Sequence, residues 1–260
     1  MMIEKSEIMS KAIDPQKDND VLKYIQIKQY ATIEEICQAL YISQATARRR
    51  LQELQDAGLI IRTRGGAKVV ETNNFLPTFT FRSHQNSIEK KKIAMLGAGL
   101  IKDGDYVFLD GSTSAFFISE YLSGFKNLKV MTNGIDTLSQ LSKNGIDAYS
   151  TGGRVSSENR SVLVGPVAKK TVSDFRANIV FFSANAVTPE GELIDVFEEE
   201  NELRQLMMQR SDKKIFLCDS RKLFRRAAHL LCTMNDIDYL VTNSDINSYF
   251  VNDYSAKIKF

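Results

Sequence analysis

The sequence predicts an α/β protein in two parts: a small N-terminal unit of short helices with a hairpin, and a larger domain with a mainly parallel, helix-covered sheet. Three observations support this. Apolar residues recur at helical spacing before residue 57, a β-rich hairpin follows at 59–70, and β-rich segments alternate with helical ones beyond residue 88. The last rhythm is typical of a parallel sheet with helices on its faces.

The composition allows two domains and favours an anionic partner. The chain has 260 residues, of which 43% are hydrophobic, and a net charge of +2. A chain of this length can bury a substantial core. The charge is uneven, because residues 44–70 hold six lysines and arginines against Glu53 and Asp56, a local charge of +4. Such a basic segment near one end favours an anionic polymer.

The cysteines and the apolar segments favour a cytoplasmic protein with no membrane partner. Cys37, Cys218 and Cys232 are an odd number without a closely spaced pair, so neither a disulfide framework nor a zinc site is indicated. The longest apolar segment, residues 93–101, is far shorter than the ~18 residues that a membrane span needs. The N-terminus lacks the apolar segment of a signal peptide.

Two short helices are expected after the apolar residues Val21, Leu22 and Ile25. Thr32 can cap the first helix, and Ser43 supplies an N-cap oxygen for the second, which ends at Gly58. A turn of three or four residues joins the two helices, which predicts a helix-turn-helix. Their apolar faces consist of Ile33, Ile36, Cys37 and Leu40, then Ala47, Leu51 and Leu54.

The second helix and the hairpin after it favour binding to double-stranded DNA. Gln44, Arg48 and Arg49 lie away from the apolar stripe, where amides can bond adenine and arginines can bond guanine or phosphate. The alternative is a charged face that contacts only water. The basic hairpin at 59–70, with its Gly-Gly turn, forms a wing and favours DNA. The predicted DNA-binding residues are Ser43, Gln44, Thr46, Arg48, Arg49, Arg50, Arg62, Arg64, Gly65 and Gly66.

We expect the DNA-binding domain to span residues 1–72, a linker 73–87, and the larger domain 88–260. The segment before residue 87 loses periodicity and gathers Thr, Asn and Pro77. A helix from residue 88 opens the larger domain. Its strands are predicted at 105–109, 128–132, 146–150, 178–183, 214–218 and 238–241.

Polar residues follow several of these strands. Ligands of parallel sheets bind beyond the carboxyl ends of the strands, so these residues could line one pocket. They are Asp110, Gly111, Ser112, Thr113 and Ser114, then Thr132 and Asn133, then Gly152, Gly153 and Arg154, then Asp219 and Lys222.

The first of these groups is suited to a phosphate. Gly111 lets the backbone turn, and residues 112–114 then supply hydroxyls and free N–H groups at a helix N-terminus. Arg154 and Lys222 are available as cations. The alternative is that Asp110 and the first serine only cap the following helix. The repetition of hydroxyl, amide and glycine at several strand ends favours a ligand site.

Other chemistries lack their motifs. The chain has no nucleotide P-loop, no Gly-x-Gly-x-x-Gly after a strand, and no second glycine of a hydrolase elbow. His84 and His229 have no spaced partner for a metal site or a catalytic triad, so we expect structural roles for both. No metal or cofactor is expected.

These motifs, in this order, resemble the DeoR-type bacterial transcription regulators over nearly the whole chain. The residues similar to the family's DNA-binding signature are Ser43, Thr46, Arg48, Arg49 and Leu51, with Arg64, Gly65 and Gly66. Those similar to its effector-domain landmarks are Asp110, Gly111, Ser112, Thr113, Thr132, Asn133, Gly152, Gly153, Gly165, Glu200, Asp219, Ser220 and Lys222. The chain departs from the family at Arg50, where an acid is usual, at Tyr41, where glycine is usual, and in having Asp110 directly before Gly111.

The resemblance implies a winged helix-turn-helix joined to a sugar-phosphate-sensing domain with a ribose-phosphate-isomerase-like fold. The effector would contact Asp110, Gly111, Ser112, Thr113, Ser114, Thr132, Asn133, Gly152, Gly153, Arg154, Glu200 and Lys222. We therefore predict a homo-oligomeric transcription regulator that is a repressor and not an enzyme. A phosphorylated sugar is expected to control its affinity for operator DNA. The alternatives are a sugar-phosphate isomerase with Asp195 or an acid of 198–202 as its base, and a non-specific nucleic-acid-packaging protein.

Overall fold

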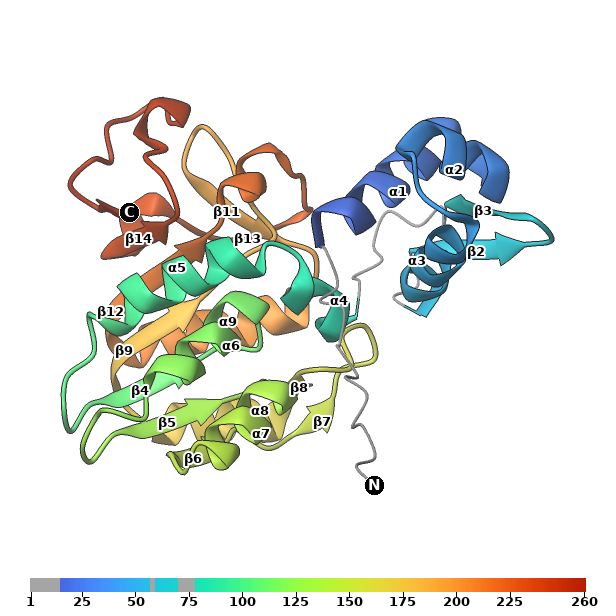
Figure 1. The fold of residues 1–260 in the computed structure, drawn as a ribbon. Coiled ribbons are helices and arrows are strands. Elements are labelled where there is room, and N and C mark those ends of the chain that lie inside the picture. The colour runs from blue at the N-terminus through green and yellow to red at the C-terminus, as the bar shows by residue number, and fades with distance from the viewer. Residues whose placement is uncertain (1–14, 57–58, 70–77) are drawn as a thin grey trace, which may run out of the picture. The chain divides into compact units, whose positions relative to one another are not determined.

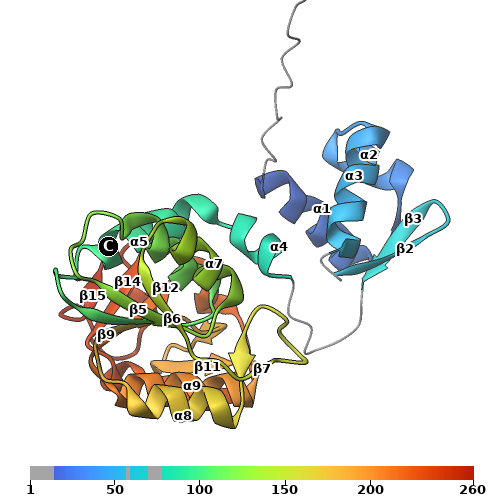
Figure 2. The same ribbon diagram turned by 90° about the horizontal axis from the view of Figure 1, so that it is seen from below.

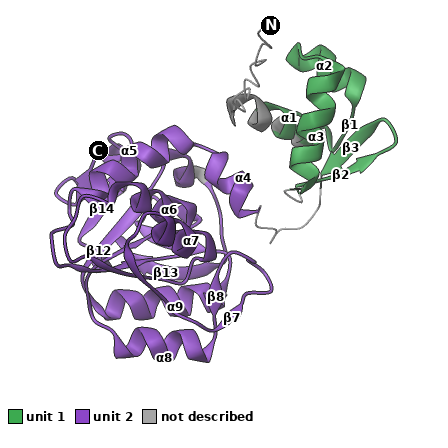
Figure 3. Ribbon diagram, turned by 60° about the horizontal axis from the view of Figure 1, so that its bottom comes forward, with its two compact units in different colours: residues 1–73 green, residues 74–260 purple. Residues whose placement is uncertain are grey.

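The computed structural model describes residues 15–56, 59–69 and 78–260. The chain divides into two compact units, residues 1–73 and 74–260 (Figure 3). Each unit is described by itself. Within the described residues, no helix is both long enough and apolar enough to cross a membrane.

The first unit is a winged helix-turn-helix, as predicted (Figure 1). Thr32 caps the second helix in a reciprocal capping box, because its hydroxyl accepts from the Glu35 backbone and the Glu35 carboxylate accepts from the Thr32 backbone. The antiparallel sheet has the order β1-β3-β2. Its elements are α1 (Pro15–Lys28), β1 (Tyr30–Thr32), α2 (Ile33–Leu40), α3 (Gln44–Asp56), β2 (Ile60–Thr63) and β3 (Gly66–Val69).

The hairpin differs in detail from the expected Gly-Gly turn. Gly65 takes the turn with φ +92°, whereas Gly66 already belongs to β3. A Cβ on Gly66 would lie 2.3 Å from the Ala31 carbonyl oxygen, so this glycine allows β3 to pack against β1, a strand that the sequence did not indicate. The predicted helix end at Gly58 lies outside the described residues.

The second unit is built on a seven-stranded parallel sheet with the order β15-β14-β12-β9-β4-β5-β6. All six strands that the sequence predicted are present in it. Figures 1 and 2 show α5, α6 and α7 over one face of the sheet and α8 and α9 over the other, and each face has its own buried apolar core. The strands are β4 (Tyr106–Leu109), β5 (Lys129–Thr132), β6 (Asp147–Ser150), β9 (Ala177–Phe182), β12 (Ser211–Cys218), β14 (Tyr239–Thr242) and β15 (Ile258–Lys259). The covering helices are α5 (Ser87–Ala98), α6 (Thr113–Ile118), α7 (Ile135–Lys143), α8 (Pro166–Asp174) and α9 (Glu198–Gln209).

Short elements beside the main sheet were not predicted. The hairpin β7 (Arg154–Val155) and β8 (Leu163–Val164) and the antiparallel sheet of β10 (Ala186–Val187), β11 (Glu192–Asp195) and β13 (His229–Thr233) consist of strands of two to five residues. Strands this short carry little periodic signal.

A helix also lies inside the expected linker. Helix α4 (Phe79–His84) is capped by Thr78, whose hydroxyl accepts from the Phe81 backbone N–H. The Phe79 ring packs edge-on against Phe116 of α6, with 5.3 Å between ring centroids. Helix α4 therefore belongs to the packed body of the second unit.

Candidate functional site

The N-terminal half of α3 presents the polar face that the sequence predicted. Ser43 caps the helix, and its Oγ lies 3.2 Å from the Thr46 backbone nitrogen, which donates to it. Gln44, Arg48 and Arg49 are exposed. Arg48 Nη2 donates to Gln44 Oε1 at 3.2 Å, which orders an amide and a guanidinium side by side. This pair is a candidate for reading base edges.

Arg50 does not share this exposed face. Its side chain is buried, with 3% of the residue exposed. The reason is helical phase, because Arg50 lies three residues after Ala47 and four before Leu54, on the inward stripe of α3. The expectation that Arg50 reaches DNA is therefore wrong.

The wing carries two arginines in different situations. Arg62 Nη1 donates to Gln52 Oε1, and the Arg62 backbone donates to Gln55 Oε1 at 3.0 Å, so β2 is fastened to α3. Arg64 lies exposed at the turn before Gly65. Arg64 is thus the wing cation best placed to reach a neighbouring phosphate.

In the second unit, Asp110 joins three elements at the carboxyl edge of the sheet. It follows β4 and is buried, with 2% exposed. Its carboxylate accepts from the backbone N–H groups of Ser112 and Ser183, both at 3.1 Å, and from Arg204 Nε at 2.9 Å. Asp110 therefore fixes the loop before α6 against β9 and α9.

One residue of the loop that follows Asp110 caps helix α6. Ser112 Oγ accepts from the Ala115 backbone at 3.1 Å, which is the capping role kept open as the alternative. Ser114 Oγ is different, because it is buried and has no hydrogen-bond partner among the described residues. A Cβ on Gly111 would lie 2.2 Å from Val162 Cγ1, so only glycine fits this close approach.

The β5 end lies directly beside this loop. A Cβ on Gly134 would lie 3.0 Å from the Gly111 Cα. Thr132 Oγ1 accepts from the Gly134 backbone at 3.0 Å, and Asn133 Nδ2 donates to the Leu163 carbonyl at 3.2 Å. Asn133 Oδ1 is buried without a partner among the described residues. The site thus holds a second unpaired polar atom.

Lys222 reaches the same edge from the end of β12. Its buried ammonium donates to Ser183 Oγ and to the Ala184 carbonyl, the latter at 2.7 Å. Ser183 also donates its N–H to Asp110, so Lys222 and Asp110 are linked through one residue. Burial lowers the pKa of Lys222, and Asp219 opposes that shift. A buried lysine of this kind favours an anionic ligand.

Lys90 of α5 is a second buried cation, which the sequence analysis missed. Its ammonium donates to the Arg82 carbonyl. Burial lowers the pKa of Lys90 to about 7, with Lys222 and Arg82 adding to the shift and Asp219 opposing it. The signal was present, because Lys90 shares its helical face with the buried Ile93.

Helix α4 adds Arg82 and leads to Asn86. Arg82 Nη2 donates to Asn159 Oδ1 at 3.3 Å. Burial lowers the pKa of Arg82, and Glu200 is the largest opposing influence. Asn86 Nδ2 donates to Asp219 Oδ1 at 3.2 Å. The predicted linker thus supplies residues to the site.

Glu200 and its neighbours form the acidic side of the site. Burial raises the pKa of Glu200 to about 7, while Arg204 opposes the rise. Arg204 Nη2 lies 3.8 Å from Glu200 Oε2, and Arg204 Nη1 lies 3.1 Å from Asp195 Oδ2. Three carboxylates, counting Asp110, therefore share one buried guanidinium.

The Gly152–Arg154 group borders the site but does not supply an unpaired cation. Gly152 and Gly153 both have positive φ, and a Cβ on Gly153 would lie 2.4 Å from the Val164 carbonyl oxygen. Arg154 forms a two-pronged ion pair with Glu199, with Nη2–O distances of 2.9 and 2.7 Å. The expected cationic role of Arg154 is therefore reduced by its partner.

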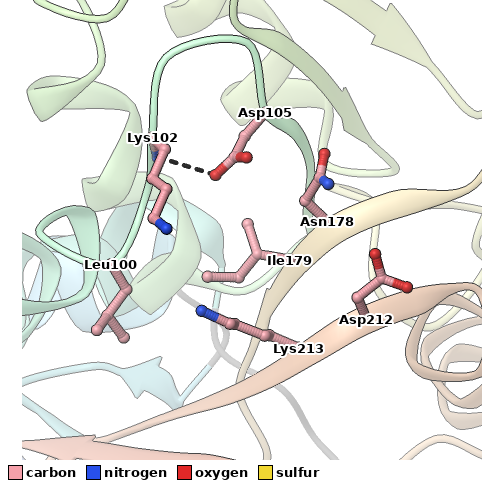
Figure 4. A pocket seen from close by; sticks show the side chains of 7 residues that line it. All are labelled: Leu100, Lys102, Asp105, Asn178, Ile179, Asp212 and Lys213. Carbon is pink, nitrogen blue, oxygen red and sulfur yellow. Dashed lines mark hydrogen bonds between the residues drawn. The ribbon is translucent and has the colours of Figure 1, made fainter.

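A hollow at the opposite edge of the sheet is separate from this site (Figure 4). It lies at the amino ends of β4, β9 and β12, between Lys102, Asp105 and Lys213. Asp105 accepts there from the Lys102 backbone at 2.8 Å. None of the predicted effector residues lines it.

Comparison with known proteins assigns the family. Residues 18–73 match the DeoR-like helix-turn-helix domain, and residues 85–244 match the DeoR C terminal sensor domain. The chain belongs to the DeoR family of transcription regulators.

Relatives resemble this DeoR-family chain over most of their length. The HTH-type transcriptional repressor GlcR of Bacillus subtilis is 32% identical over 231 residues, covering 88% of each chain. The lactose phosphotransferase system repressor of Lactococcus lactis subsp. lactis is 30% identical over 239 residues, covering 90% of this chain and 93% of the relative. Ribose 5-phosphate isomerase A of Methanocaldococcus jannaschii aligns with a TM-score of 0.41 at 15% identity, over 54% of this chain and 55% of the isomerase.

Proposed function

We propose that this regulator is a repressor that binds double-stranded operator DNA through α3 and the wing, and that a phosphorylated sugar bound in the sensor domain changes its operator affinity. The DNA contacts are assigned to residues 1–72 and the sugar site to 88–260, with Arg82 and Asn86 of the 73–87 segment added to it. A regulator of this kind acts in the compartment that holds the DNA, the cytoplasm.

The observation that carries the proposal is the pair of buried lysines at the carboxyl edge of the sheet. Lys90 and Lys222 both lie near Asp219, burial lowers the pKa of each ammonium, and the charge of Lys222 lowers the pKa of Lys90 further. Asp219 is the carboxylate that most opposes the lowered pKa of both lysines, and one carboxylate does not balance two buried ammonium groups. A phosphate dianion would supply the missing negative charge.

The rest of the site fits the hydroxyls of a sugar. Asn133 Oδ1 can accept from a hydroxyl, and Ser114 Oγ can donate or accept. Glu200 lies on the acidic side of the same edge. Buried polar atoms without partners are costly unless a ligand satisfies them. The names of two relatives, a repressor of a lactose phosphotransferase system and a glycerol-3-phosphate regulon repressor of Haemophilus influenzae, agree with an effector of this class.

We further infer that the sensor domain binds its sugar without converting it. An isomerase needs a carboxylate that is ready to take a proton. Asp195 and Glu200, the candidates for this role, both face the guanidinium of Arg204. Proton transfer by either carboxylate would have to break its buried pair with Arg204, which is costly. Incubation with phosphorylated aldoses and ketoses should therefore show no turnover above that of a Glu200→Gln variant.

The protein should bind DNA as a symmetric homo-oligomer. One recognition helix contacts only a few base pairs, and two copies related by symmetry read two half-sites. Sedimentation with labelled DNA tests this, since a monomer that binds one half-site with full affinity would contradict it.

Thermal-shift screening tests the effector class. A ligand that binds only the folded protein raises its melting temperature. Phosphorylated sugars should raise it, whereas the matching unphosphorylated sugars at equal concentration should not. The proposal fails if only unphosphorylated ligands stabilise the protein.

A further inference from the structure

Tyr41 combines a strained backbone with an almost fully exposed side chain. It ends α2 in the left-handed region, with φ 52° and ψ 43°, and its backbone N–H donates to the Cys37 carbonyl. The residue is 95% exposed. Left-handed backbone is unfavourable for a residue with a Cβ, and glycine is the residue that ends helices in this way most readily.

Neither feature of Tyr41 stabilises the folded unit. An exposed ring buries no apolar surface, and the left-handed conformation costs free energy that a glycine would not. An outlier of this kind, retained on the surface, indicates a function that needs the side chain. The compensation then comes from a contact outside the chain.

The position of Tyr41 identifies the partner. It lies two residues before Ser43, the cap of α3, and thus beside the N-terminal end of the recognition helix. When that end enters a major groove, the residues just before it pass along the phosphates that border the groove. A tyrosine hydroxyl is a common donor to phosphate oxygens. The exposed Arg48 and Arg49, further along α3, give the same DNA-binding unit a positive charge.

We propose that Tyr41 is a DNA-binding residue whose hydroxyl donates to a phosphate of the operator backbone. This inference rests on the proposed DNA binding by α3. The inference explains the left-handed backbone of Tyr41. Glycine would stabilise this turn better, but only a tyrosine places a hydroxyl where it can donate to the DNA.

The chemistry of such a contact separates it from those of the arginines. Tyrosine is neutral, so its contact releases no counterion and leaves the salt dependence of affinity unchanged. A phosphate carries no sequence information, so losing the contact weakens binding to all duplexes by a similar factor.

The test uses the full chain with Tyr41→Gly and Tyr41→Phe. The probes are a duplex selected by the wild-type protein from a random-sequence library and a mixed-sequence duplex of equal length. Hydrogen exchange of the α2 and α3 amides reports local stability. Asn127→Gly is the matched control, because Asn127 is exposed, has φ 54°, and belongs to the sensor unit.

Replacing Tyr41 by glycine is expected to increase the stability of the helices and to decrease the affinity for DNA. Tyr41→Gly should slow exchange in α2 and α3, yet weaken binding to both duplexes by about tenfold, comparable with the loss of one hydrogen bond to a charged group. Tyr41→Phe should show most of the loss in affinity with little change in exchange. Asn127→Gly should leave the affinity for both duplexes unchanged.

Several results would overturn the inference. Unchanged affinity in Tyr41→Gly removes it, while DNA binding by α3 stands. A loss confined to the selected duplex indicates a base contact instead of a phosphate contact. A loss accompanied by a smaller species in sedimentation assigns the ring to a contact between copies. Failure of the wild-type protein to select any duplex from the library or to bind the mixed-sequence duplex overturns the proposed function together with this inference.

Discussion

Arg204 and Asp110 form a buried ion pair, with 2.9 Å between Arg204 Nε and Asp110 Oδ2 and with both side chains less than a tenth exposed. Asp110 in turn accepts from the backbone of Ser112 and Ser183. Helix α9 therefore holds the loop before α6 in place through a single carboxylate. The sequence marked Asp110 as a ligand contact, whereas the structure shows it occupied in positioning the loop.

Arg204→Met should destabilise the protein strongly. Removing the guanidinium leaves buried carboxylates without their shared partner, which costs about 3–5 kcal/mol. Arg176→Met is the control, since Arg176 pairs with Asp212 on the surface and such pairs contribute roughly 0–1 kcal/mol. Urea unfolding of the full chain measures both. Equal free energies of unfolding for the two variants would refute the positioning role.

Lys222→Met should weaken effector binding and leave effector-free operator binding intact. The substitution keeps the approximate volume of the buried side chain and removes the charge that we propose binds the phosphate. We expect about a tenfold or larger loss of phosphosugar affinity in calorimetry, the size of a lost charge-assisted hydrogen bond. Lys169→Met is the control, because Lys169 pairs with Glu202 at the surface. Wild-type effector affinity in Lys222→Met would rule out the lysine as a phosphate ligand.

Effector affinity should fall as pH rises above about 7, the pKa to which burial lowers Lys90. Below that value the ammonium is charged and attracts the phosphate; above it, binding must take up a proton, so affinity decreases with pH. Calorimetry at pH 6.5 and 8.5 in buffers of different ionisation enthalpy measures the uptake.

Two variants isolate the contribution of Lys90. Lys90→Arg keeps its charge at both pH values and should flatten the profile. Glu200→Gln removes the other group with a pKa of about 7 and should leave the decline in place. A decline that persists in Lys90→Arg but disappears in Glu200→Gln would assign the titration to the acid.

Arg49→Ala should weaken DNA binding in a way that reveals what Arg49 contacts. Its guanidinium is half exposed and lies 3.9 Å from Glu53, a loose pair that DNA can replace. Loss of a phosphate contact lowers the slope of log affinity against log salt by ~0.9. Loss of a base contact relaxes preference at one base pair by ~1–3 kcal/mol. Arg176→Ala, in the sensor unit, is the control, and an affinity and slope equal to wild type would make the arginine face a solvated surface.

The sequence predicted six of the seven strands of the main sheet because most of them are apolar runs bounded by turn residues; β6, with the sequence Asp-Ala-Tyr-Ser, is the exception. It did not predict α4, whose six residues make less than two helical turns and whose place depends on Phe79 meeting the distant Phe116. Contacts between residues far apart in the chain leave no local periodic signal.

In the sensor site, too, some residues could be predicted from the sequence and others could not. The strand-end polar residues were visible, because the polarity changes abruptly after each apolar run. Lys90 was not, since it opens the run Lys90-Lys91-Lys92, and only the helical phase of the buried Ile93 and Ala94 singles it out. The same phase argument would have placed Arg50 inside. Arg204 had only Glu200, four residues earlier on α9, as a local signal, because its other two partners come from the end of β4 and from β11.

The most direct test of the account is operator affinity measured with and without effector. Fluorescence anisotropy of the selected duplex gives the dissociation constant alone and at a saturating concentration of a phosphosugar found by thermal shift, and calorimetry gives phosphosugar affinity with and without the duplex. We predict that each ligand changes the affinity of the other by the same factor, about 5–150-fold. A phosphosugar that binds the protein and leaves operator affinity unchanged would contradict the central claim.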